Sequence, residues 1–185
     1  MKITLTENLK QKPDFKNLGF GKYFTDHMLY MEYVDGKWGE VEIRPFSDIA
    51  VNPASVVFHY GQEIFEGMKA YKNTDGKITM FRPRDNILRM NRSAKRLCMA
   101  ELPVDEVLEG IFELVRIEKD WIPTDSGTSL YIRPTMIANE NFLGVHPSKK
   151  YIFFVILSPV GSYYAHGLEP TRIYVEDVFN RAALG

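Results

Sequence analysis

Two neighbouring segments with helical periodicity, set between pairs of strand-like runs, constrain the fold of this chain most. One stripe of residues 84–98 carries Ile87, Asn91, Ala94 and either Leu97 or Cys98. After Pro103, apolar side chains at helical spacing recur at Val104, Val107, Leu108, Ile111, Phe112 and Val115. Each stripe is typical of an amphipathic helix with one buried face. Two such helices among short strands predict an α+β fold.

The strand-like runs are arranged as hairpins. Residues 27–34 alternate loosely, Asp35-Gly36-Lys37 supplies a turn, and residues 38–43 return. A second hairpin is expected from strands at 64–71 and 77–81, with a turn over 73–76. Residues 129–134 and 151–158 predict two further strands, the second apolar enough to be buried on both faces.

The two ends of the chain have a different character. The segment up to about Phe20 is polar and without periodicity, so we expect an arm with little structure of its own. Residues 161–170 are loop-like. Residues 171–175 predict a short strand that begins another unit.

Composition excludes several classes of protein. The 185 residues are 45% apolar, and 23 Lys and Arg stand against 24 Asp and Glu for a net charge of -1. No overall field therefore favours nucleic acid or an anionic membrane. The longest strongly apolar run, 151–157, is far shorter than the ~20 residues of a spanning helix. A single cysteine, Cys98, allows no internal disulfide and favours a cytoplasmic location.

Several catalytic motifs are absent from the sequence. There is no P-loop, and Gly19-Phe20-Gly21 lacks the third glycine and the preceding strand of a dinucleotide site. The four histidines show no metal-ligand spacing, so we expect no metal site. The nucleophile elbow of serine hydrolases is missing as well.

A run of basic residues allows three interpretations. It consists of Arg82, Arg84, Arg89, Arg92, Lys95 and Arg96. A solvated helix face is the simplest interpretation, and a nucleic-acid surface lacks the interleaved aromatic residues and positive charge that it needs. The third is anion capture, because an Arg on a packed helix supplies a forked charged clamp for phosphate.

The segment 129–134 is more specific. If it is a strand, period two places Ser129, Tyr131 and Arg133 on one face and Leu130 and Ile132 on the other. A phenol beside a guanidinium suits a substrate that bears a carboxylate, although an exposed polar face explains the spacing equally well. Lys69 could form a Schiff base if it were buried, but an exposed strand lysine is the simpler expectation.

Beyond these patterns, the chain resembles the branched-chain amino acid aminotransferases. The resemblance rests on EIFEGMKAY at 63–71, LYIRP at 130–134 and FVILSPVG at 154–161, together with the stretches 20–28, 81–98 and 144–145. These motifs follow the order and spacing of the family from about residue 15 onward. The resemblance implies a pyridoxal 5'-phosphate enzyme of the fold shared with D-amino acid aminotransferases, acting on leucine, isoleucine or valine with 2-oxoglutarate or glutamate.

The resemblance also implies domains and site residues. It divides the chain into a small N-terminal α/β domain at 1–160, an interdomain loop at 161–170 and the start of a cofactor-binding domain at 171–185. Arg89 and Arg181 would bind the cofactor. Substrate-binding roles would fall to Phe24, Tyr60, Phe65, Tyr131, Arg133, Leu143, Val145 and Tyr163. Leu143 and Val145 would reach the pocket of a partner subunit, which implies a homodimer.

The same resemblance places the lysine that carries the cofactor about ten positions after Arg181, beyond Gly185. We therefore expect no catalytic residue within these 185 residues and no transaminase activity from them alone. Two alternatives stay open. One is a D-amino acid aminotransferase or aminodeoxychorismate lyase relative, and the other is a non-catalytic module that dimerises or binds a small anion.

Overall fold

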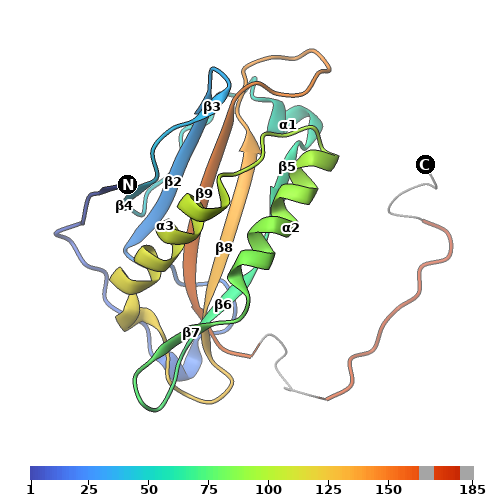
Figure 1. The fold of residues 1–185 in the computed structure, drawn as a ribbon. Coiled ribbons are helices and arrows are strands. Elements are labelled where there is room, and N and C mark those ends of the chain that lie inside the picture. The colour runs from blue at the N-terminus through green and yellow to red at the C-terminus, as the bar shows by residue number, and fades with distance from the viewer. Residues whose placement is uncertain (163–168, 180–185) are drawn as a thin grey trace.

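The computed structural model describes residues 1–162 and 169–179. Its nine described strands form a single sheet, in the order β1-β4-β2-β9-β8-β6-β7, with β3 paired to β2 and β5 paired to β8. The two long helices lie across one face of this sheet (Figure 1). Every strand pair is antiparallel except β1 with β4. The predicted α+β class is confirmed.

The centre of the sheet is the pair β8 (Ser129–Ala138) and β9 (Tyr151–Val160). The two strands pair along all ten residues, from Ser129 opposite Val160 to Ala138 opposite Tyr151. Both strands are longer than the sequence predicts. Leu130 and Ile132 are fully buried in the core beneath the helices, whereas Tyr131 and Arg133 are half-buried on the other face. The predicted division of this strand into two faces is confirmed.

The first hairpin forms at the predicted position. β2 (His27–Val34) turns through Asp35 and Gly36, whose φ angles of 53° and 80° are those of a two-residue hairpin turn. The returning run is split in two. β3 (Lys37–Trp38) closes the hairpin, and β4 (Glu42–Pro45) pairs further along β2.

The second hairpin differs from its prediction. The run expected as one strand at 64–71 consists of β5 (Glu63–Phe65) and β6 (Met68–Lys72), and β7 (Ile78–Met80) returns. The break falls at Glu66 and Gly67. The Glu66 side chain is buried in ion-pair and hydrogen-bond contacts with the helix layer, and the Gly67 backbone lies directly against Tyr131.

The helix layer consists of α2 (Pro83–Arg96) and α3 (Val104–Ile117). The shorter helix α1 (Val56–Tyr60) precedes β5, and 3-10 turns occupy Phe15–Asn17 and Lys119–Trp121. The predicted stripes hold for most positions. Asn91 is buried within its stripe because its side chain bonds the backbone of Leu102 in both directions, at 2.9 and 2.8 Å.

Three positions of the predicted stripes are wrong. Leu97 and Cys98 are exposed because α2 ends at Arg96, and the backbone at Cys98 turns to a φ of 54°. Phe112 is half exposed. It borders an open apolar depression with Pro83 and Met80 instead of facing the core.

The N-terminal arm is more ordered than expected. β1 (Lys2–Ile3) extends the sheet, and Leu18 is buried. The backbone N–H of Thr6 donates to Nε2 of His27 at 2.9 Å, and Nδ1 of His27 lies 2.5 Å from the buried carboxylate of Glu118. These long-range bonds fix the arm, and local sequence periodicity carries no signal for them.

The strand predicted at 171–175 does not form. The stretch is exposed throughout, and no described strand lies beside it, so its backbone has no ladder of hydrogen bonds to join. Tyr163 and Arg181 lie outside the described residues. Among the described residues, no helix is long and apolar enough to cross a membrane.

Candidate functional site

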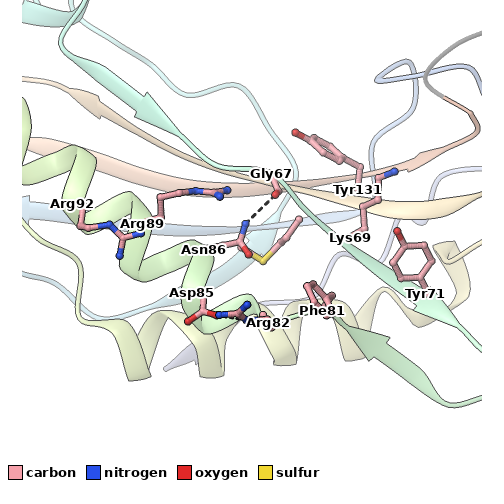
Figure 2. A pocket seen from close by; sticks show the side chains of 11 residues that line it. Gly67, Lys69, Tyr71, Phe81, Arg82, Asp85, Asn86, Arg89, Arg92 and Tyr131 are labelled. Atoms are coloured by element: carbon pink, nitrogen blue, oxygen red, sulfur yellow. Dashed lines mark hydrogen bonds and ion pairs between the residues drawn. The ribbon is translucent and has the colours of Figure 1, made fainter. Parts of the chain in front are cut away.

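A pocket of about 530 Å³ opens between β6, α2 and β8 (Figure 2). It is lined by Gly67, Met68, Lys69, Tyr71, Phe81, Arg82, Asp85, Asn86, Arg89, Arg92 and Tyr131. Four of these side chains are cationic and one is anionic, so the pocket favours an anion. The pocket contains Arg89 from the predicted anion clamp and Tyr131 from the predicted carboxylate face.

Most of the cationic side chains of the pocket come from α2 and the residue just before it. Pro83 occupies the first turn, where its missing N–H costs nothing, and Arg82 before it has a left-handed backbone with φ 46°. Arg82 pairs with Asp85 across this turn, as Figure 2 shows. One and two turns further along, α2 presents Arg89 and Arg92 to the same pocket.

Arg89 is held by a buried carboxylate. Its Nε lies 2.5 Å from Oε1 of Glu66 and its Nη2 lies 2.7 Å from Oε2, which is a two-pronged ion pair. The Arg89 side chain is 59% exposed, whereas that of Glu66 is only 7% exposed. Glu66 therefore anchors the inner edge of a guanidinium whose Nη1 end is directed away from this carboxylate.

The Glu66 carboxylate is also bonded by its own strand and by α2. Oε2 accepts hydrogen bonds from Asn86 Nδ2 at 3.0 Å and from the Gly67 N–H at 3.2 Å. Burial alone raises the pKa of Glu66, but the hydrogen bonds from Arg89, Asn86 and Gly67 outweigh burial, and the pKa is lowered. Glu66 is consequently an anion at neutral pH.

Tyr131 and Arg133, the two β8 residues predicted to face a substrate carboxylate, lie in contact with each other. Nε and Nη2 of Arg133 donate to the Tyr131 hydroxyl oxygen at 3.1 and 2.8 Å. The Arg133 guanidinium also lies 4.3 Å from the centre of the Phe65 ring. Because the Tyr131 oxygen accepts these two bonds, its own O–H remains available as a donor. The structure thus brings together Phe65, Tyr131 and Arg133.

The other predicted substrate residues form separate contacts. The Tyr60 hydroxyl donates to the carbonyl oxygen of Leu143, and the ring of Phe24 stacks on Phe46 at 5.3 Å. Leu143 and Val145 are 62% and 88% exposed on the loop between β8 and β9. Lys69 is an exposed strand lysine, as the simpler interpretation expected.

Sequence reasoning missed Glu66 and Asn86 as site residues. A signal was present for Glu66: alternation along the strand places it on the same inward face as Ile64. A carboxylate on the core face of a strand requires a charged or polar partner. The described residues contain no cluster of three or more His, Cys, Asp or Glu side chains able to hold a metal ion.

Comparisons with known proteins identify the relatives of this chain. No family model matches it. It is 52% identical over 178 residues to branched-chain-amino-acid transaminase 1 of Bacillus subtilis, covering 95% of this chain and 50% of that protein. It is 49% identical over 186 residues to branched-chain-amino-acid aminotransferase 2 of the same organism, covering 100% of this chain and 51% of that protein.

Solved structures agree with the sequence relatives. The branched-chain amino acid aminotransferase of Escherichia coli superposes with a TM-score of 0.53 at 26% identity, over 74% of this chain and 40% of that one. The T.th. enzyme with pyridoxamine 5'-phosphate gives 0.52 at 27% identity, over 72% of this chain and 40% of that one. The chain spans about half the length of the curated relatives it matches. It is a homologue of the branched-chain-amino-acid aminotransferases over its whole length, with the fold of their N-terminal small domain.

Proposed function

We propose that this chain supplies the phosphate-binding arginine and the substrate-carboxylate wall of a pyridoxal 5'-phosphate-dependent branched-chain aminotransferase. The observation that carries the proposal is the meeting of Arg89 and Tyr131 in one cationic pocket. Support also comes from the T.th. relative, whose structure is a complex with N-(5'-phosphopyridoxyl)-L-glutamate and matches this chain at 26% identity. The bound cofactor would supply an electron sink for the substrate's α-carbon.

The residues present fit the phosphate of such a cofactor. Glu66 holds one edge of Arg89 and leaves the Nη1 end for a phosphate oxygen. Lys69, Arg82 and Arg92 line the same pocket, so the local charge stays positive after both Asp85 and Glu66 are counted. Arg181 is proposed as a second cofactor contact from outside the described residues.

The Tyr131–Arg133 pair fits a substrate carboxylate. Arg133 would supply charge and Tyr131 a hydroxyl donor, with the two already held in contact at 2.8 Å. The proposed substrates are leucine, isoleucine or valine, with 2-oxoglutarate accepting the amino group and glutamate returning it. Glutamate carries a second carboxylate that the branched-chain amino acids lack, and this pair would have to bind that group as well.

An apolar wall for the aliphatic side chain is proposed from Phe24, Tyr60, Phe65 and Tyr163. Such a wall gains about 0.8 kcal/mol for each buried CH₂ group. Leu143 and Val145 are proposed to complete the pocket of a second copy, and their exposure is compatible with that role. The functional unit would then be a homodimer.

Three further proposals accompany this function, the first two from the family resemblance and the third from composition. The domain boundaries are 1–160, 161–170 and 171–185. The lysine that carries the cofactor lies outside these 185 residues, and within them Lys69 is exposed and unsuited to the task, so the 185 residues alone do not transaminate. The single cysteine supports a cytoplasmic location.

A transaminase assay on the gene product carried to its own stop codon tests the proposal. We expect turnover of leucine with 2-oxoglutarate, loss of that turnover in Arg89→Ala, and none from residues 1–185 alone. Activity on D-alanine in place of leucine would identify a D-amino acid relative. An inert product that still binds phosphate would support a non-catalytic anion-binding module and overturn the aminotransferase proposal.

A further inference from the structure

We propose that Glu66 is the positioning residue of the phosphate site: it fixes the orientation of Arg89 and its distance from the Tyr131–Arg133 pair. This inference rests on the proposed phosphate role of Arg89 and adds a second residue to it. Glu66 would touch neither cofactor nor substrate. Its effect on binding would pass entirely through the Arg89 guanidinium.

The Glu66 carboxylate is held in one position by its hydrogen bonds and its burial. It accepts four hydrogen bonds, two from Arg89, one from Asn86 and one from the Gly67 N–H. It is buried, while most of Arg89 is exposed. A buried carboxylate with several donors has one orientation, whereas an exposed arginine has many, so the carboxylate sets the geometry of the pair.

Glu66 is also tied to the strand that carries the proposed carboxylate-binding pair. Its backbone N–H donates to the carbonyl oxygen of Pro134 at 2.9 Å, directly after Arg133 on β8. On the helix side, Asn86 Nδ2 bonds the Gly67 carbonyl oxygen at 3.1 Å, a contact drawn in Figure 2. The chain at Glu66-Gly67 thus links β8 to α2. It thereby connects the side of the pocket that carries Arg89 with the strand that carries Tyr131 and Arg133.

Arg92 provides a matched comparison within the same helix. It lines the same pocket and carries the same charge one turn beyond Arg89. Glu66 forms its ion pair with Arg89 and not with Arg92. General electrostatic attraction of an anion would involve both arginines, whereas positioning by Glu66 would involve Arg89 alone.

The test compares pyridoxal 5'-phosphate with pyridoxal, which lacks the phosphate, on the gene product carried to its own stop codon. The readout is the ratio of their two dissociation constants. Glu66→Gln keeps the size of the side chain and removes its charge. Partners that orient a ligating group are worth about 10- to 100-fold in affinity at metal sites, and we expect about tenfold loss of the phosphate preference here. Pyridoxal binding should stay unchanged.

A double-mutant cycle separates positioning from general damage to the fold. Glu66→Gln should have no further effect on the ratio in an Arg89→Ala background and its full effect in an Arg92→Ala background. If Glu66→Gln does not fold, Glu66→Asp retains the charge but withdraws it by one methylene, and the same loss is expected.

The possible failures are distinguishable. A normal ratio in Arg89→Ala would overturn the phosphate role of Arg89 and this inference with it. A reduced ratio in Arg89→Ala beside a normal ratio in Glu66→Gln would overturn this inference alone. Equal loss of pyridoxal and pyridoxal 5'-phosphate binding in Glu66→Gln would also overturn it, because the effect would then be structural.

Discussion

The hydroxyl of Tyr131 occupies the space that a side chain on Gly67 would need. A Cβ atom built on Gly67 would lie 2.5 Å from the Tyr131 oxygen and 3.2 Å from the ring carbon that bears it. Gly67 lies at the corner just before β6, Tyr131 lies on β8, and both line the pocket. Glycine at this position lets the phenol lie against the backbone, where its oxygen meets Arg133.

Gly67→Ala should therefore displace Tyr131. We expect a loss of about 1–3 kcal/mol in the free energy of unfolding, the usual range for an overpacked site, measured by urea denaturation. Tyr131→Phe removes the nearest clashing atom, so the double variant should recover most of this loss. Simple addition of the two single effects would show that the clash is not the cause.

Glu66 should make stability depend on pH in the acid range. Its pKa is lowered in the fold below the ordinary value of 4.5, so the stabilisation is complete above about that pH and disappears as pH falls through the lowered pKa. We expect wild type to exceed Glu66→Gln by about 1–3 kcal/mol at pH 7 and the difference to shrink below pH 4.5. A difference that stays constant from pH 7 to pH 3 would contradict this assignment.

Gly110→Ala sets two effects against each other within α3. Alanine is the better helix former by about 1 kcal/mol, but its Cβ would lie 2.7 Å from Leu29 Cδ1 and 2.8 Å from Val41 Cγ1. Overpacking of this kind costs about 1–3 kcal/mol, so a net loss of stability is expected in thermal denaturation. Val41→Ala opens space there, and in that background Gly110→Ala should do less harm.

Arg133→Ala should lower kcat/KM for glutamate more than kcat/KM for leucine. A hydrogen bond to a charged group is worth about 1.5–3 kcal/mol, and glutamate brings a second carboxylate to the proposed pair. We expect kcat/KM for glutamate to fall about tenfold further than that for leucine. The comparison uses the gene product carried to its own stop codon. Equal losses for the two substrates would refute a special role of Arg133 toward the second carboxylate.

Glu118 should tolerate glutamine better than alanine. Because Nε2 of His27 accepts the Thr6 N–H at 2.9 Å, the ring proton lies on Nδ1 and is donated to Glu118. Glu118→Gln keeps an acceptor there, whereas Glu118→Ala leaves a buried donor unsatisfied at a cost of about 1–3 kcal/mol. Urea denaturation measures this loss of stability, and proteolysis of the arm up to about Phe20 measures whether the arm is released. Equal destabilisation by the two variants would count against this account.

Local periodicity accounts for the parts of the fold that the sequence predicts well. The two long helices and the two-faced strand at Tyr131 and Arg133 follow from spacings of 3.6 and 2, which depend only on neighbouring residues. The same reasoning failed where long-range contacts override it. The strand at 64–71 is interrupted at Glu66 and Gly67, where the Glu66 side chain bonds Arg89 of α2, and the arm is ordered because Thr6 meets His27.

The sequence by itself determined the fold class, the face of β8 that carries Tyr131 and Arg133, and the presence of a candidate phosphate arginine at Arg89. Only the tertiary structure decided that Glu66 binds Arg89 and that Tyr131 packs on Gly67. Those contacts join residues 23 or more positions apart. The order and register of the strands create them, and these depend on burial across the whole sheet, which no local pattern of residues encodes.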